Sequence, residues 1–260
     1  MFRSMLIAFS MYSKIPVPSV NWESENMKYA VAWLPAVGGV IGALIGGWCI
    51  LAQKLAVTPV LFGAVAAFFP LAVSGGFHLD GFCDTVDALS SHQTKEKKLE
   101  ILKDPHTGAF AVMGCVVYLL LTFALWTELG PTSPAAPLLC GGFVLSRSLS
   151  GLSVVTFRGA KKSGLLALFS AAADKRTVRL LLMLWTAAVF AVWFWLSPLF
   201  ACAFLVAAGG AFVYYRVMSY RQFGGITGDL AGFFIQICEL ILLVAAVVVQ
   251  KGMEVSGCIW

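Results

Sequence analysis

Seven apolar stretches, each about 20 residues long, constrain what this chain can fold into. A membrane-spanning α-helix needs roughly 20 apolar residues, so each stretch is long enough to cross a bilayer. We therefore predict an all-α fold, a polytopic membrane helical bundle of about seven transmembrane helices that forms one integral membrane domain over residues 1–260. The expected spans are Tyr29–Leu51, Val57–Gly76, Gly108–Leu129, Ala135–Phe157, Val178–Ser197, Leu199–Met218 and Leu230–Val249.

The scarcity of charge supports a lipid environment and excludes other classes. Charged residues make up 12% of the chain, whereas they make up about 25% of a typical soluble domain. The spans leave no room for a separate soluble catalytic domain. The net charge of +5 does not indicate nucleic-acid binding, because the basic residues form no contiguous platform with aromatic residues.

The basic residues predict the orientation of the bundle. Threading the loops alternately to two sides leaves only Lys54 and Lys251 on one side. The other side receives Arg3, Lys14, Lys28, Lys95, Lys97, Lys98, Lys103, Arg158, Lys161, Lys162, Lys175, Arg176, Arg179, Arg216 and Arg221. Because cytoplasmic loops carry the excess of Lys and Arg, we expect a cytoplasmic N-terminus. The same side receives Asp80, Asp84, Asp87, Asp104, Asp174 and Asp229, so we expect an active site facing the cytoplasm.

An aspartate cluster follows the second span. If the segment Gly75–Asp87 is helical, Asp80, Asp84 and Asp87 lie within an arc of about 60° on one face. Their mutual repulsion would be relieved by Mg²⁺, which proteins commonly hold with one or two carboxylates plus waters and substrate phosphates. The alternative is a solvated polar helix end. The absence of Lys and Arg between Gly75 and Ser91 favours half of a metal–diphosphate site.

Two further segments on this side carry acids. Lys103 and Asp104 precede the third span, where Asp104 is equally well explained as a helix N-cap before Pro105. The turn Gly224–Asp229 precedes the last span, and its glycines would let backbone N–H groups approach a phosphate, while Thr227 and Asp229 would contact a metal or its waters. A reverse turn without function has a similar sequence.

Three other residues are candidates for chemistry. Arg147 and Glu239 lie within expected spans, so each should face the bundle interior or a wet cavity. Arg147 would suit a phosphate, and Glu239 would either pair with it or bind a polar neighbour. His78 lies two residues before Asp80, where it could position a phosphate or accept a proton.

These motifs resemble those of a known family. The segments Gly75–Asp87, Lys103–Asp104 with Gly108, and Gly225–Asp229, together with Lys14–Pro18 and Leu34–Gly38, are similar to cobalamin synthase, the adenosylcobinamide-GDP ribazoletransferase family. The resemblance covers nearly the whole chain. It implies assembly of the nucleotide loop of adenosylcobalamin: α-ribazole or its 5′-phosphate attacks the diphosphate of adenosylcobinamide-GDP and releases GMP, with Mg²⁺ as the cofactor.

That chemistry gives each candidate residue a hypothetical role. We expect the metal ligands to be Asp80, Asp84, Asp87 and Asp229, and the catalytic groups to be His78, Asp80 and Asp84. We expect the substrate and its phosphates to be bound by Lys103, Asp104, Arg147, Arg221, Gly225, Thr227 and Gly228. The resemblance also implies the bacterial cytoplasmic (inner) membrane. It leaves open a homo-oligomer or an association with other cobalamin pathway enzymes.

Two other functions compete with this interpretation. A membrane prenyltransferase or another lipid-diphosphate transferase would also use aspartates on a helical bundle, although the residues after Asp80 and Gly81 do not match the phosphatidyltransferase pattern. A transporter is the non-enzymatic alternative. Its coupling carboxylates should lie near the membrane midplane, often in a repeated half, and we find no internal repeat.

Overall fold

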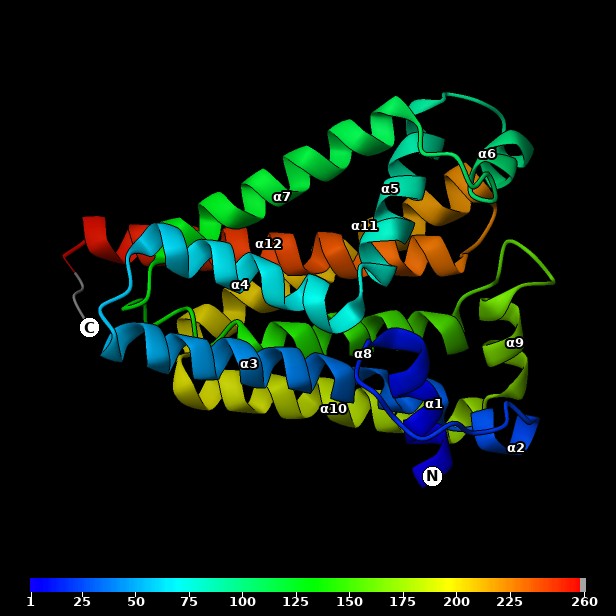
Figure 1. Cartoon of the computed structure of the whole chain (residues 1–260), viewed down its shortest axis with the longest axis horizontal. Helices are drawn as coiled ribbons and strands as arrows, with labels where there is room; N and C mark the ends of the chain where they lie inside the picture. Colours follow the sequence, from blue (N-terminus) through cyan, green and yellow to red (C-terminus); the bar gives the residue numbers. More distant parts are fainter. Residues whose placement is uncertain (258–260) are drawn as a thin grey trace.

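The bundle is built from seven long helices. The structure is a computed structural model and describes residues 1–257. The long helices are α3 (Leu34–Lys54), α4 (Pro59–Ser74), α7 (Ala109–Leu129), α8 (Cys140–Thr156), α10 (Lys175–Leu196), α11 (Pro198–Phe223) and α12 (Gly228–Val255). They run roughly along the long axis of the molecule (Figure 1). Helix α12 is central, because it packs against α5, α7, α8 and α11.

The short helices gather at one end of the bundle, the end that also holds the N-terminus (Figure 1). They are α1 (Phe2–Tyr12), α2 (Ser24–Met27), the 3₁₀ helix η1 (Ala30–Trp33), α5 (Phe77–Ser90), α6 (Lys95–Ile101) and α9 (Leu165–Ala172). The loops that carry most of the basic residues lie at this same end, which we call the basic end. Helix α12 ends at the opposite end.

The all-α prediction is confirmed, but the predicted number of seven spans is not. Every expected span contains a helix. Within residues 1–257, five helical segments are long and apolar enough to cross a membrane, or six if α4 and α5, bent by 95°, form one broken span. The remaining helix, α8, has only 17 residues and includes a buried arginine, Arg147. The chain is thus an integral membrane protein in which α8 is an interior helix.

The turn between α4 and α5 places the aspartate-bearing helix across the basic end. Gly75 and Gly76 have φ angles of 63° and 79°, a left-handed conformation that glycine adopts without steric cost. The Lys14 side chain lies across Gly75, and the Lys14 N–H donates to the Val73 carbonyl at 2.8 Å. Helix α5 therefore leaves α4 at 95° instead of continuing it, and its acids lie at the bundle end (Figure 1).

Candidate active site

The segment that carries Asp80, Asp84 and Asp87 is helical, so the three acids share a face, and this helix packs closely on the start of α12. A Cβ atom on Gly81 would lie 2.8 Å from the Asp229 carbonyl oxygen, and one on Gly232 would lie 3.1 Å from the His78 carbonyl oxygen. Two glycines thus allow the two backbones to approach each other. The carboxylate of Asp84 lies within electrostatic range of those of Asp80, Asp229 and Asp87. The acids that the sequence places in two distant motifs are therefore neighbours.

A cavity of about 280 Å³ lies beside this contact. Its polar wall carries His78, Asp80, Lys161, Thr227, Gly228 and Asp229, and the rest of its lining is largely apolar, including Met11, Tyr12, Val154, Leu165, Leu166 and Phe169. We call this space the main cavity. It brings together five predicted site residues: His78, Asp80, Thr227, Gly228 and Asp229.

Asp80 also lines a second cavity, of about 520 Å³. This space lies between the end of α1 and the turn that joins α4 to α5. Its lining includes Ser13, Lys14 and Ser74. Asp80 consequently lies on the wall between a largely apolar cavity and a more polar one.

Thr227 and Asp229 are held by the first turn of α12. The Thr227 hydroxyl oxygen accepts the Leu230 N–H at 3.2 Å, and the hydroxyl donates to Asp229 Oδ2 at 3.3 Å. Thr227 is thus the N-cap of α12 and also orients the carboxylate. Negative charge is favourable beside a helix N-terminus. The N-terminus of α12 therefore stabilises the Asp229 carboxylate despite the nearby carboxylate of Asp80.

Lys161 belongs to the main cavity although the sequence did not identify it as a site residue. Its segment is tied to the turn before α12, because Ala160 N–H donates to the Ile226 carbonyl at 2.8 Å and Ile226 N–H donates to the Arg158 carbonyl at 2.9 Å. Burial lowers the pKa of Lys161. The negative charge of Asp229 opposes this shift, and the positive charge of Lys103 adds to it. In the sequence, Lys161 was indistinguishable from the other basic loop residues.

His78 is a buried residue in the lining of the main cavity, and its ring nitrogens are unpaired. Its side chain is 2% exposed, and neither ring nitrogen has a hydrogen-bond partner among residues 1–257. The ring stacks on that of Tyr12, with centroids 6.2 Å apart and an interplanar angle of 15°. Because buried polar groups are nearly always hydrogen-bonded, these nitrogens indicate a ligand or ordered water in the cavity.

Several predicted site residues lie outside the main cavity. Asp87 packs against Gly108 at the start of α7. Gly225 lies against the backbone of Arg158 and Ala160, so it supports the turn instead of facing a phosphate. Arg221 lines a separate surface groove on α11.

The segment before α7 is close to the site without lining it. Lys103 acts electrostatically on Lys161, so it contributes positive charge nearby. Asp104 instead accepts hydrogen bonds from the backbone N–H of His106 at 2.9 Å and from its ring at 2.7 Å. These bonds hold the pKa of Asp104 below its usual range. Asp104 therefore stabilises its own turn.

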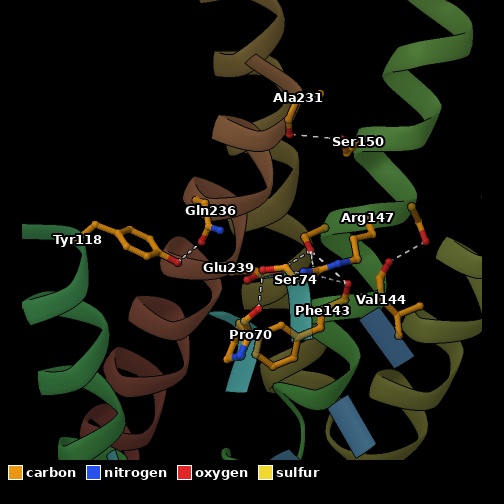
Figure 2. Close-up of polar contacts among 12 residues, drawn as sticks. Pro70, Ser74, Tyr118, Phe143, Val144, Arg147, Ser150, Ala231, Gln236 and Glu239 are labelled. Atoms are coloured by element: carbon orange, nitrogen blue, oxygen red, sulfur yellow. Dashed lines mark hydrogen bonds and ion pairs between the residues drawn. The ribbon is translucent and has the colours of Figure 1, made fainter. Parts of the chain in front are cut away.

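Arg147 and Glu239 pair with each other in the bundle interior (Figure 2). Arg147 is 1% exposed, and its Nη1 also donates to the Phe143 carbonyl at 3.1 Å. Ser146 donates to Glu239 Oε1 at 2.9 Å, and on the same face of α12 the Tyr118 hydroxyl donates to Gln236. The pairing that we considered for Glu239 is confirmed. The Arg147 guanidinium already has a carboxylate partner and lines neither the main nor the second cavity, and the phosphate role expected for it stays a prediction.

The four expected metal ligands do not form a ready-made metal cage. Within residues 1–257, no group of three or more His, Cys, Asp or Glu side chains is arranged to hold a metal ion. The main cavity offers two carboxylates, Asp80 and Asp229. That number suits Mg²⁺, which typically takes one or two protein carboxylates and completes its shell with water and substrate phosphates.

Comparisons with known proteins identify the family. A model of the cobalamin-5-phosphate synthase family matches residues 4–247. An adenosylcobinamide-GDP ribazoletransferase from Lachnoclostridium phytofermentans is 42% identical over 98% of this chain and 97% of the relative. A protein with the same name from Desulfitobacterium hafniense is 33% identical over 94% of this chain and 96% of the relative. Another from Clostridium perfringens is 30% identical over 92% of this chain and 94% of the relative. No solved structure matches. The chain therefore belongs to the cobalamin-5-phosphate synthase family, and its activity is that of an adenosylcobinamide-GDP ribazoletransferase.

Proposed function

We propose that the main cavity is the site at which adenosylcobinamide-GDP is joined to α-ribazole or its 5′-phosphate, with release of GMP. The observation that carries this proposal is the meeting of Asp80 from α5 and Asp229 from α12 on one cavity wall with Lys161. Two carboxylates and a cation at the mouth of a bundle suit a diphosphate and its metal. No feature of the structure favours a prenyltransferase or a transporter over this reaction.

The reaction is a displacement at phosphorus. A ribose hydroxyl of the acceptor attacks the phosphorus bonded to cobinamide, the bond from that phosphorus to the bridging oxygen breaks, and GMP leaves with that oxygen. Such transfers depend mainly on positioning and charge stabilisation. Lys161 would neutralise the diphosphate, and His78, whose ring nitrogens are unpaired, or one of the aspartates would take the hydroxyl proton.

Mg²⁺ fits the donor set of the main cavity. When bound, it would neutralise the diphosphate and stabilise the departing GMP. Asp80 and Asp229 are the residues that would hold it. Asp84 lies within electrostatic range of both carboxylates and would strengthen the attraction for a cation. Asp87 is positioned against α7 and is the weakest candidate among the four expected ligands.

Substitution of the two carboxylates tests this proposal. We expect Asp80→Asn and Asp229→Asn each to lower the rate of GMP release about 100-fold or more, since each removes charge stabilisation of the transition state. Both variants should also weaken Mn²⁺ binding, measured by electron paramagnetic resonance with adenosylcobinamide-GDP present. Glu128→Gln is the matched control, because Glu128 pairs with Lys251 on the side opposite the basic end. Full activity in Asp80→Asn would contradict the proposed site.

We further propose that the protein resides in the bacterial cytoplasmic membrane with the basic end facing the cytoplasm. The accumulation of Lys and Arg at that end supports this orientation. The substrates support it too, since nucleotides are available in the cytoplasm and do not cross a bilayer unaided.

A further inference from the structure

Part of the lining of the main cavity is aromatic. Tyr12 of α1 contacts Phe77 of α5 with ring centroids 5.8 Å apart and Phe169 of α9 with centroids 6.4 Å apart. Phe169 is 1% exposed and is supported from behind by Trp22, at 5.8 Å. We call Tyr12, Phe77 and Phe169 the aromatic wall. Three rings from three separate helices thus line the cavity that Asp80 and Asp229 also line.

The residue next to the aromatic wall, His78, has an unmet polar requirement. His78 lines the cavity beside Tyr12 and is buried, yet neither of its ring nitrogens has a partner within the described residues. A buried polar group left unpaired is unfavourable, because it has lost its hydrogen bonds to water without replacement. A ligand that combines a flat apolar surface with one or two polar ring atoms would satisfy both the rings and the imidazole. A heteroaromatic base has these properties.

The size of the cavity restricts the ligand further. At about 280 Å³, the cavity is near the lower limit of small-molecule sites, which run from about 300 to 1,000 Å³. A nucleoside fits such a space, whereas the corrin macrocycle does not. The reaction offers two nucleosides, the guanosine of the donor and the acceptor itself.

The chemistry of the wall distinguishes these two bases. Guanine has a row of donors and acceptors along its edge and would need several polar partners. The dimethylbenzimidazole of α-ribazole has no exocyclic donor and one free ring nitrogen, so a single imidazole N–H satisfies it. The wall offers three rings and one imidazole. It therefore matches the acceptor base better than guanine.

We propose that the aromatic wall and His78 bind the benzimidazole base of the acceptor and direct its ribose toward Asp80 and Asp229. The inference rests on the function proposed above and assigns one substrate to one side of the site. Asp80 also lines the second, more polar cavity beside Lys14. That cavity is a second approach to Asp80 and is available to the diphosphate-bearing donor. His78 then acts on the base, and an aspartate takes the ribose proton.

Steady-state kinetics with both substrates varied test the assignment. We expect Phe169→Ala to raise the KM for α-ribazole about tenfold or more, the effect usual for losing one aromatic stacking partner of a base, and to leave the KM for adenosylcobinamide-GDP within about twofold. Phe169→Trp should retain the wild-type KM for α-ribazole. Phe62→Ala is the matched control, because Phe62 is fully buried in α4 and lines neither cavity.

A second variant and a binding measurement keep the test decisive. Phe77 is 40% exposed, so Phe77→Ala should fold even if Phe169→Ala does not. Titration calorimetry with α-ribazole alone should show weaker binding to either variant than to the wild type, and guanosine should not compete. An unchanged KM and affinity for α-ribazole, or competition by guanosine, would overturn the assignment. Wild-type protein that releases no GMP would instead overturn the proposed function.

Discussion

Lys161 and Lys162 are adjacent in the chain but differ in their surroundings. Lys161 is partly buried on the wall of the main cavity near Asp229, whereas Lys162 is exposed. No carboxylate lies within ion-pair distance of Lys161 among residues 1–257. The backbone pairing between residues 158–160 and Ile226 determines which of the two lysines faces the cavity. Lys161 is thus free to bind an anionic substrate.

Substitution of these two lysines should separate their roles. We expect Lys161→Met to lower kcat/KM for adenosylcobinamide-GDP about tenfold to a hundredfold, because a hydrogen bond to a charged group contributes about 1.5–3 kcal/mol. Lys161→Arg should restore part of the loss, since it returns the positive charge. The measurement is GMP release at varied donor concentration.

Lys162→Met serves as the control for this comparison. It removes the same charge one residue away and should leave kcat/KM close to the wild-type value. Equal losses in Lys161→Met and Lys162→Met would show that the net charge of the segment matters and that the specific position of Lys161 does not.

At the level of helices, α8 and α12 are joined by a buried ion pair. Desolvation of two charges costs several kcal/mol per ion, so such a pair contributes little net stability while intact. Removal of one partner is different, because it leaves the other charge buried without compensation. The pair between Arg147 and Glu239 therefore makes the stability of the α8–α12 contact depend on both residues together.

This interdependence predicts a non-additive pair of substitutions. We expect Arg147→Met to destabilise the protein by about 3–5 kcal/mol, seen as a lower unfolding temperature in detergent. The double variant Arg147→Met with Glu239→Met should recover most of that stability and retain GMP release. If Arg147 bound substrate phosphate, as the sequence suggested, the double variant would be stable but would bind adenosylcobinamide-GDP weakly.

The predictable part of the site depends on local patterns. The helical spacing of Asp80, Asp84 and Asp87 is a short-range feature, and it is found in the structure. The N-cap role of Thr227 is equally local, but it was not predicted. Gly225 and Lys161 acquire their positions from the pairing of two segments that are distant in the chain. The length of the apolar stretch predicted a membrane span at α8. The length does not show that neighbouring helices surround this short helix. Long-range packing, which a single sequence does not encode locally, accounts for these differences.

The two ends of the helical bundle differ in their cavities and in their basic residues, and this difference has a functional consequence. The main cavity, the second cavity and most of the basic residues lie at the end that holds α1, α5 and α9 (Figure 1). At the other end, Lys251 pairs with Glu128. Since charged nucleotides do not cross a bilayer, substrate can reach the cavities from only one aqueous side.

Sealed vesicles of known orientation should reveal which side that is. We expect inside-out vesicles, in which the cytoplasmic face is exposed, to release GMP from added adenosylcobinamide-GDP and α-ribazole without detergent. Right-side-out vesicles should do so only after permeabilisation, because the basic end then faces the lumen. Total activity after permeabilisation normalises the protein content of the two preparations. Equal activity in sealed vesicles of both kinds would show that substrate reaches the site from both sides. Activity confined to right-side-out vesicles would reverse the proposed orientation but would not contradict the proposed chemistry of the site.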